Sequence, residues 1–430
     1  MSQNTHQLVI VGGGVAGLDL ATHLANKPAG SKQLAVTLVD REMAYVWKPM
    51  LHTIAAGTSD SGAQQTVFAA QALSCGFDFQ PGEAIAIDRE RKEVRLAALT
   101  LSGEEVVPPR SITYDTLVLA IGSKANDFGT PGVAEHCSRI DCRSEAIAFN
   151  DQLRAKLIKH ATAGQVLTVA IVGGGATGVE LAAELIQIGS TAERYGLAGA
   201  SRHLKVVLIE SGPRLLGPFP ENVASAAQAK LEELGVEVRT GARVTEVDAS
   251  GVRLNGNETV FAELRVWAAG VKAPALIGTL GGVELTRSGQ VVVDETLRIP
   301  ADTTVFALGD CASPRLPGRD MPVPTTAQAA HQQAVYLCKY LPKMIAGAKV
   351  PPATYHDFGS LVSLGGFDAY GSLGRFGFFR GGFIRGRIAQ LGHVMLYRRY
   401  QARIHGSRRG SLLWLIDVLG RRVRPAARLS

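Results

Sequence analysis

The sequence predicts an α/β fold built from two related modules, the second inserted into the first. Residues 9–18 and residues 170–179 each contain an apolar strand that breaks into Gly-x-Gly-x-x-Gly and runs into a helix-forming stretch. In this pattern the first glycine makes a tight turn, the second lets the backbone approach a pyrophosphate, and the third packs helix on strand. The phosphates then meet the N–H groups at the helix start. Two copies therefore predict two Rossmann-like dinucleotide-binding domains.

An acidic residue follows the next predicted strand in both modules. Asp40 ends the run Ala-Val-Thr-Leu-Val-Asp, and Glu210 ends the run Lys-Val-Val-Leu-Ile-Glu. Each carboxylate is placed to accept hydrogen bonds from the hydroxyls of a ribose. The alternative is an ordinary solvated acid at the end of a strand. The interval from Gly173 to Glu210 exceeds the usual spacing of about 20 residues. We therefore predict an insertion at residues 189–203, between helix and strand.

Both modules close in the same way, with a buried strand that ends in Ala-x-Gly or Ala-Ala-Gly, at residues 114–123 and 264–270. A further strand at residues 304–310 ends in Gly-Asp, which would let Asp310 reach a ribitol or phosphate chain. The first module is thus predicted to resume after residue 280. The expected domains are residues 1–150 and 281–354 for the first module, 151–280 for the second, and 355–430 for a C-terminal region of different composition.

The composition indicates a globular protein. The chain has 430 residues, 46% of them hydrophobic, which indicates a globular protein of two to three domains. The amino terminus lacks the pattern of a secretory signal, and no run of about 18 apolar residues could span a bilayer, so we expect retention in the cytosol. Cys137 and Cys142 have the four-residue gap of some redox-active flavoenzyme disulfides. Buried or incidental thiols are the better interpretation.

The charge is concentrated at the C-terminus. The net charge is +7, yet residues 375–430 hold thirteen arginines, no lysine and one acidic residue, Asp417. This region therefore carries +12 and the remainder −5. Such asymmetry points to an anionic surface, either a membrane or a nucleic acid.

Two segments of this basic region have the pattern of a helix lying in the headgroup plane of a membrane. Residues 412–419 are predominantly apolar, include a Trp and are far too short to span a bilayer. A core helix with a solvated basic face is the alternative. The flanking arginines are Arg408, Arg409, Arg421, Arg422 and Arg424, and the upstream helical repeat is Val394, Tyr397, Tyr400, Gln401 and Ile404, beside Arg398, Arg399 and Arg403.

Several further motifs occur along the chain: Trp47-Lys-Pro-Met-Leu-His52, Gly-Gly-Gly-Ala-Thr-Gly-Val-Glu-Leu from residue 173, Trp267-Ala-Ala-Gly-Val-Lys-Ala-Pro, Ala307-Leu-Gly-Asp-Cys-Ala and Ala327-Gln-Ala-Ala-His-Gln-Gln333. Together they resemble type II NADH dehydrogenases, the single-subunit, non-pumping NADH:quinone oxidoreductases. The resemblance runs from about residue 8 to the last residues and is greatest to enterobacterial-type members. The glycine loops are shared by many flavin disulfide reductases. The Ala-Gln-x-Ala-x-Gln run with Trp-Lys-Pro is more specific.

The resemblance implies that the first module, residues 1–150 and 281–354, binds FAD and that residues 151–280 bind NADH. Asp40 would lie on the adenosine ribose of FAD and Glu210 on the ribose of NADH. An acid there repels a 2′-phosphate and favours NADH over NADPH, although nearby Arg214 weakens this preference. The implied FAD site is Gly12, Gly14, Gly17, Asp40, Lys48, Ala120, Gly122, Asp310 and Ala327. The implied NADH site is Gly173, Gly175, Thr177, Gly178, Glu210, Ala269 and Gly270.

Three residues are expected to be catalytic. Glu180 is predicted in the first turn of the second module's helix, where its carboxylate would interact favourably with the helix dipole. In the family that the chain resembles, however, this acid is associated with the nicotinamide and the flavin. Gln328 and Gln332 are four residues apart, hence on one helix face, and could donate to a quinone carbonyl; the alternative is a solvated polar face. His331 points elsewhere on that helix and is not interpreted as catalytic.

The expected protein is a peripheral flavoenzyme of the respiratory chain. It would transfer a hydride from NADH to FAD and two electrons to a membrane quinone such as ubiquinone, without proton pumping. We expect attachment to anionic lipid on the cytoplasmic side of the cell inner membrane, a homodimer, and no nucleic acid partner. The alternatives are a sulfide:quinone reductase, which requires paired cysteines beside the flavin, and a ferredoxin or rubredoxin reductase, which needs no quinone glutamines. A non-enzymatic nucleic-acid-binding redox sensor leaves the glutamines unexplained.

Overall fold

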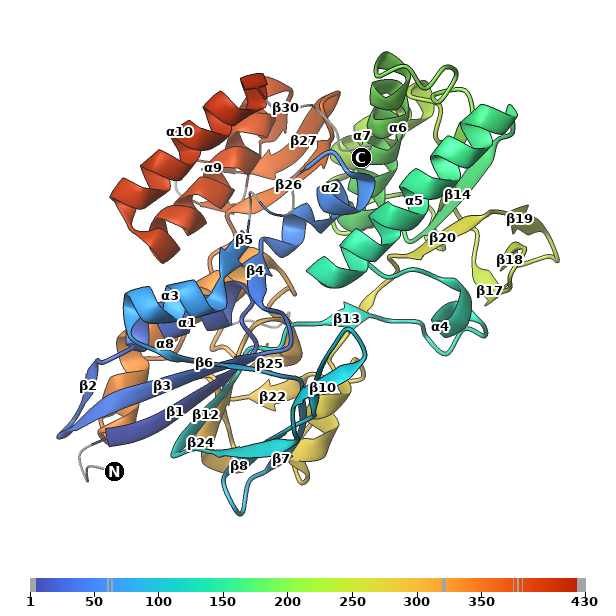
Figure 1. The fold of residues 1–430 in the computed structure, drawn as a ribbon. Helices are drawn as coiled ribbons and strands as arrows, with labels where there is room; N and C mark the ends of the chain where they lie inside the picture. Colours follow the sequence, from blue (N-terminus) through green and yellow to red (C-terminus); the bar gives the residue numbers. More distant parts are fainter. Residues whose placement is uncertain are drawn as a thin grey trace. The chain divides into compact units, whose positions relative to one another are not determined.

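The computed structural model describes residues 5–59, 62, 65–318, 322–373, 375–376, 379–380 and 382–423 (Figure 1). The chain forms two compact units, and each contains one of the two glycine loops. The first unit comprises Met1–Lys48, Gln65–Lys124 and Val271–Tyr355, and the second comprises Pro49–Gln64, Ala125–Gly270 and His356–Ser430.

The first unit is built on a mostly parallel sheet with the strand order β2-β3-β1-β12-β24-β23, and β6 also pairs with β3. Strands β3, β1, β12 and β24 are parallel to their neighbours in that series, and most of their apolar residues are buried. The bounds are β1 Thr5–Val11, β2 Pro28–Ala29, β3 Lys32–Asp40, β6 Asp78–Pro81, β12 Thr116–Leu119, β23 Arg298–Ile299 and β24 Asp302–Ala307.

Strand β1 occupies the position at which the strand order of this sheet reverses. Its neighbour on one side is β3 and on the other side is β12, which comes much later in the chain. Open α/β sheets bind ligands outside the carboxyl end of the strand at such a point. The glycine loop at residues 12–17 follows β1 directly, so the topology of the sheet places it there. Strand β24 joins β12 only after the chain has passed through the second unit.

The helices of the first unit are α1 (Val15–Leu24), α3 (Phe68–Cys75) and α8 (Ala327–Ile345). Helix α1 is almost wholly buried and packs against α8 and α3 (Figure 1). Helix α8 begins after Thr326, whose side chain accepts a hydrogen bond from the backbone N–H of Ala329 and so caps the helix.

Short strands complete the first unit: β4 (Ala44–Val46), β5 (Gln65–Val67), β7 (Ala84–Asp88), β8 (Glu93–Leu96), β9 (Leu99–Leu101), β10 (Glu104–Val107), β11 (Arg110–Thr113), β22 (Val291–Val293) and β25 (Ala312–Pro314). Two more, β13 (Lys124–Ala125) and β21 (Val271–Lys272), lie where the chain leaves this unit and re-enters it.

The second unit repeats the plan with a parallel sheet of order β16-β15-β14-β20, in which β14 is the point of reversal. A small antiparallel sheet, β17-β18-β19, belongs to the same unit. The bounds are β14 Leu167–Val172, β15 Leu204–Ile209, β16 Glu237–Arg239, β17 Val244–Val247, β18 Gly251–Leu254, β19 Thr259–Phe261 and β20 Leu264–Trp267.

The helices of the second unit include α2 (Leu51–Ala56), α4 (Val133–His136), α5 (Arg143–Ala163), α6 (Ala176–Arg194) and α7 (Glu221–Glu233). Helix α2 packs against both α5 and α6. Because α6 continues to Arg194, the prediction of an insertion at residues 189–203 is wrong over residues 189–194. The long interval before Glu210 comes from a long helix together with a loop at residues 195–203.

The C-terminal region packs within the second unit. Strands β26 (Gly359–Leu364), β27 (Asp368–Leu373) and β30 (Phe383–Arg385) form an antiparallel sheet that contacts α6, α7 and α9 (Arg387–His405), and α9 in turn packs against α10 (Ser407–Val423). Two short strands, β28 (Arg375–Phe376) and β29 (Phe379–Arg380), pair with each other. Among the residues that the structure describes, no helix is long and apolar enough to cross a bilayer.

The orientation of α9 corrects one sequence-based interpretation. Tyr397, Tyr400 and Ile404 were expected on a face turned toward lipid, but all three are buried against the protein. Arg398 donates to Asp417 of α10 at 2.6 Å, so the acidic residue of the basic region holds the two helices together. Of the predicted flanking arginines, Arg424 and the side chains of Arg421 and Arg422 lie outside the described residues.

Candidate functional site

The first glycine loop has a backbone that only glycine fits. Gly12 has φ +101°, and a Cβ there would lie 2.4 Å from the Ala120 carbonyl oxygen, while a Cβ at Gly17 would lie 1.7 Å from that of Gly12. A Cβ at Gly14 would meet nothing within 4 Å, although Gly14 is the N-cap of α1 and no side chain caps this helix. The loop is thus packed on the protein side and open at the helix N-terminus, which fits the pyrophosphate of a dinucleotide.

The carboxylate of Asp40 is held by backbone donors of this loop. One oxygen accepts from the Gly13 N–H at 2.5 Å and the other from the Glu42 N–H at 2.8 Å. Burial raises the pKa of Asp40, whereas these two donors favour its charged form. Each oxygen can still accept from a ribose hydroxyl. Gly13 was not singled out in the sequence, yet a Cβ there would lie 2.4 Å from the Phe68 ring, so the position requires glycine.

Lys48 and Asp310, predicted from distant motifs, meet in one hydrogen-bond chain. The Lys48 ammonium donates to the Ser123 carbonyl oxygen at 2.8 Å, and the Ser123 hydroxyl donates to Asp310 at 2.7 Å. The adjacent Gly309 N–H donates to the side chain of Gln333 at 2.6 Å. The sequence did not reveal Ser123 or Gln333, because both act through partners far away in the chain.

Gly122 and Ala327 complete the predicted first site. Gly122 has φ +67°, and a Cβ there would meet nothing within 4 Å. Ala327 is the first residue of α8. The predicted FAD residues thus lie at the carboxyl ends of β1, β3, β12 and β24, at Lys48 after β4, and in the first turns of α1 and α8.

The second glycine loop repeats the first. Gly173 has φ +116°, and a Cβ at Gly178 would lie 1.9 Å from the Gly173 carbonyl oxygen, whereas a Cβ at Gly175 would meet nothing within 4 Å. Gly175 is the N-cap of α6, again without a side-chain cap. Thr177 is exposed in the first turn of this helix. This geometry fits a second pyrophosphate.

Glu210 is held in the second loop as Asp40 is in the first. It accepts from the N–H groups of Gly174 at 2.7 Å and Gly212 at 2.6 Å. Arg214 donates to the carbonyl oxygens of Gly217 and Phe219, at 2.7 and 3.0 Å. The guanidinium of Arg214 is thus engaged by backbone carbonyls of its own loop, which makes it a weaker candidate for binding a 2′-phosphate than the sequence suggested.

The end of β20 supplies the other predicted residues of the second site. Ala269 is half-buried, and the Gly270 carbonyl accepts from the Asn126 N–H at 3.3 Å. The indole N–H of Trp267 donates to the Asn126 carbonyl at 2.7 Å. Cys137 and Cys142 carry thiols rather than a disulfide. Burial raises the pKa of Cys137 to about 11, which keeps it protonated at neutral pH.

Glu180 lies in a buried acidic cluster, and its predicted place in the first turn is wrong. Helix α6 begins at Ala176, so Glu180 is in the second turn, where it accepts from the Ser363 N–H at 3.0 Å. Its carboxylate is 3.4 Å from Nδ1 of His52. Glu184, one turn later, is also buried and accepts a short hydrogen bond from Thr58.

Burial raises the pKa of both glutamates in this cluster. Burial, followed by repulsion from Glu184, raises the pKa of Glu180 to about 8, against the lowering effect of the Ser363 N–H. Burial also raises the pKa of Glu184. Glu180 is therefore largely protonated at neutral pH. The sequence suggested Glu180 by resemblance, but it did not identify His52, Thr58 or Glu184 as its neighbours.

Gln328 and Gln332 lie in the first two turns of α8 and are both half-buried. His331, between them, points to Asp19 of α1, with Nδ1 at 3.3 Å from the carboxylate. The two glutamines lie about one helical turn apart on α8.

Known proteins match the whole chain. The family model of pyridine nucleotide-disulphide oxidoreductases matches residues 6–334. A type II NADH:quinone oxidoreductase of Haemophilus influenzae is 38% identical, with 98% of this chain and 99% of that protein covered. The protein Ndh of Mycobacterium tuberculosis, of the same description, is 28% identical, with coverage of 97% and 89%. The structure of NDH2 from Plasmodium falciparum in complex with NADH has the same fold, with a TM-score of 0.82, 18% identity and 99% coverage of both chains.

Proposed function

Since the chain belongs to the type II NADH:quinone oxidoreductases, we propose that its first unit binds FAD and its second unit binds NADH. The observation that carries the activity is the 38% identity to such an enzyme over 98% of the chain. When bound, FAD accepts a hydride from NADH and passes two electrons to quinone. The two glycine loops support the assignment of two separate dinucleotides.

In this proposal the protein binds and orients the two cofactors. The loop at Gly12, Gly14 and Gly17 receives the FAD pyrophosphate, and Asp40 accepts from its ribose. Lys48 and Asp310 lie toward the ribitol side. In the second unit Gly173, Gly175 and Gly178 receive the NADH pyrophosphate. Glu210 accepts from the NADH ribose and repels a 2′-phosphate.

We assign a proton-holding role to Glu180. Reduction of quinone by NADH consumes one proton from outside the two substrates, since the hydride supplies only one of the two hydrogens of the quinol. The pKa of Glu180, raised to about 8, keeps a proton on its carboxyl group at neutral pH. A general acid works best when its pKa is close to the operating pH.

We propose that Gln328 and Gln332 donate to the quinone, because side-chain amides can hydrogen-bond a carbonyl without titrating. Replacing either by leucine should slow quinone reduction while flavin reduction by NADH stays nearly unchanged. Stopped-flow absorbance separates the two half-reactions. A matched control is Gln228→Leu, at a half-buried position of α7 in the other unit. An equal loss in both half-reactions would assign the glutamines to folding or to nicotinamide binding.

For the membrane, we propose attachment through α9 and α10 on the cytoplasmic side of the inner membrane, and a homodimer as the assembled form. Support comes from large apolar side chains that are exposed on both helices, with exposed Arg399, Arg408 and Arg409 beside them. Arginine near an anionic surface contributes about 1 kcal/mol per residue, and apolar burial about 25 cal/mol per Å². The exposed apolar side chains are Leu391, Met395, Leu396, Leu412, Trp414, Leu415, Ile416, Val418 and Leu419.

Vesicle co-sedimentation tests this attachment. A chain ending at His405 keeps Tyr397, Tyr400 and Ile404, whereas a cut near residue 395 would remove these three buried residues. The shortened protein should sediment less with anionic vesicles, lose activity with long-chain quinone and keep activity with water-soluble acceptors. Leu415→Glu should weaken sedimentation, but Leu101→Glu should not, since Leu101 is equally exposed in the other unit. Unchanged sedimentation of the shortened chain would rule out α10 as an anchor.

Acceptor specificity tests the activity itself. With NADH as donor, a short-chain quinone should turn over rapidly, whereas ferredoxin and rubredoxin should not. Sulfide should not replace NADH as the donor. Rapid ferredoxin reduction or sulfide oxidation would instead support one of the related two-dinucleotide reductases.

A further inference from the structure

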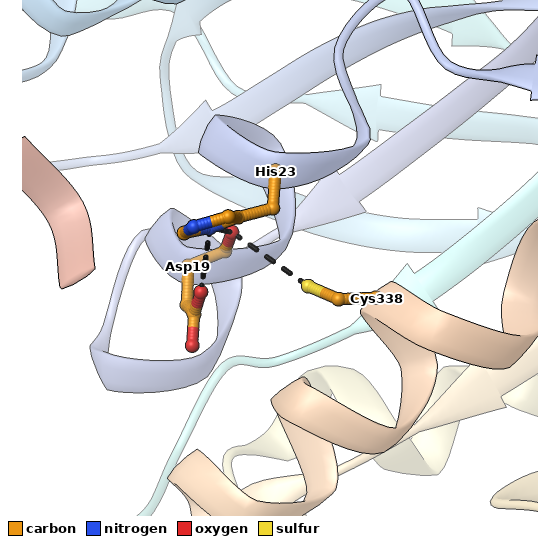
Figure 2. Close-up of side chains that lie close together, drawn as sticks. All are labelled: Asp19, His23 and Cys338. Carbon is orange, nitrogen blue, oxygen red and sulfur yellow. Dashed lines mark hydrogen bonds and ion pairs between the residues drawn. The ribbon is translucent and has the colours of Figure 1, made fainter. Parts of the chain in front are cut away.

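Asp19, His23 and Cys338 lie close together where α1 packs against α8, inside the first unit (Figure 2). A second imidazole, that of His331 on α8, also contacts Asp19. Asp19 and His23 are one turn apart on α1, and His331 and Cys338 are two turns apart on α8. The Asp19 carboxylate contacts both imidazoles: its Oδ1 is 2.8 Å from Nδ1 of His23, and its Oδ2 is 3.3 Å from Nδ1 of His331. The Cys338 thiol lies 3.9 Å from the Asp19 carbonyl oxygen.

This arrangement differs from ordinary core packing because Asp19 is fully buried in a helix whose other inward residues are mostly apolar. A buried carboxylate is costly unless cations or donors compensate it. None of the four side chains has a role in the proposed binding of FAD, NADH or quinone. The cluster therefore needs its own explanation.

The donor set matches that of a zinc ion. Imidazole nitrogen, thiolate sulfur and carboxylate oxygen are the protein ligands of Zn²⁺, whereas Mg²⁺ and Ca²⁺ prefer oxygen alone. One ligand atom from each of Asp19, His23 and Cys338 already lies within 4.8 Å of the other two. Tetrahedral ligands at bond lengths of about 2.0–2.3 Å lie about 3.5 Å apart. Small side-chain rotations would close the remaining gap.

We propose that Asp19, His23 and Cys338 bind a zinc ion, and that His331 orients the Asp19 carboxylate through its other oxygen. Binding releases the thiol proton of Cys338 and any proton on the ligating nitrogen of His23 to solvent. The side chain of His23 is 30% exposed, which gives the ion an entry path and leaves its fourth position to water. The ion links the helix that begins at the first glycine loop to the helix that carries Gln328 and Gln332.

Metal binding to the FAD-loaded full-length enzyme tests this site directly. After dialysis against a chelator, the enzyme is titrated with Zn²⁺ by calorimetry and, separately, with Co²⁺ by absorbance against the chelated sample. We expect about one equivalent of Zn²⁺ per chain, a Tm that rises with free Zn²⁺, and a thiolate-to-Co²⁺ charge-transfer band. His23→Gln and Cys338→Ser should abolish this binding, and Cys338→Ser should abolish the band. His331→Asn should weaken Zn²⁺ binding about 10- to 100-fold.

Matched controls are Cys75→Ser and His6→Gln, a thiol and an imidazole of the same unit outside the cluster. Both should bind Zn²⁺ as the wild type does. The proposal is overturned if the wild type binds no Zn²⁺, if its Co²⁺ spectrum lacks the thiolate band, or if His23→Gln and Cys338→Ser bind like the controls. These results do not depend on turnover, so they are independent of the outcome of the acceptor assays.

Discussion

Helices α1 and α6 hold equivalent places in the two modules, but their buried acids meet different surroundings. Asp19 and Glu180 each follow the last glycine of their loop by two residues, and His23 and Glu184 each come four residues later. In α1 the acid contacts two imidazoles. In α6 the acid contacts one imidazole, that of His52, and a second buried acid, Glu184, follows one turn later. Burial and the nearby Glu184 raise the pKa of Glu180 to about 8. The same backbone position thus has an imidazole one turn later in one unit and a second buried acid one turn later in the other.

The largest expected effect comes from placing an alanine in each glycine loop separately. A Cβ at Gly14 or Gly175 meets nothing within 4 Å, and both residues have ordinary φ values of −66° and −72°. Alanine should therefore leave the protein fold intact but occupy the space of a pyrophosphate. Gly14→Ala should be purified with little FAD. Gly175→Ala should keep FAD but lose at least about 100-fold in the rate of reduction by NADH, as for a substrate displaced by 1 Å.

Flavin content and stopped-flow reduction measure these two outcomes. The matched controls are Gly278→Ala and Gly217→Ala, where a Cβ also meets nothing within 4 Å and which lie outside the loops of the first and second unit. Both controls should behave as the wild type. If Gly175→Ala lost FAD, or Gly14→Ala kept it, the assignment of one dinucleotide to each unit would be wrong.

The next largest effect distinguishes Asp19 from Glu180 by their contributions to the free energy of unfolding. Without added metal, Asp19→Asn should lower the free energy of unfolding by roughly 1–3 kcal/mol, because it disrupts the contacts of a buried carboxylate with two imidazoles. Glu180→Gln should not, because Glu180 is already neutral at neutral pH. Its pKa is raised from 4.5 to about 8, so the native state keeps a proton that the unfolded chain has lost between those values. Wild-type stability should therefore fall across that pH range, by on the order of a few kcal/mol.

Urea unfolding at about pH 5 and about pH 8.5 checks this comparison. In Glu180→Gln the fall in stability between these pH values should be smaller than in the wild type, and Glu184 should account for the part that remains. An unchanged slope in Glu180→Gln would show that Glu180 is ionised in the native protein.

The sequence predicted the parts of the fold and of the site that are local in the chain. Each glycine loop, its strand, its helix and the following acid lie within one continuous segment, so their spacing carries the geometry. The contacts that define chemistry at Glu180 and Asp19 are not local. His52 and Thr58 reach α6 from a segment more than a hundred residues away, and His331 and Cys338 reach α1 from the other end of their unit.

The first residue of α6 and the orientation of α9 could not be predicted from the sequence either. Glu180 was expected in the first turn because the position of the N-cap was uncertain by one or two residues, and Gly175 settles it. Tyr397, Tyr400 and Ile404 have the spacing of an amphipathic helix, but spacing alone does not say whether the apolar face meets lipid or protein. The sheet formed by β26, β27 and β30 supplies the protein surface that covers it.

The account rests on two dinucleotides that act in succession, and the flavin spectrum of the purified enzyme tests this most directly. The protein should be yellow with bound FAD. NADH should bleach the flavin rapidly, NADPH much more slowly, and added quinone should restore the oxidised spectrum. A colourless preparation, equal rates with NADH and NADPH, or a reduced flavin that quinone does not reoxidise would contradict it.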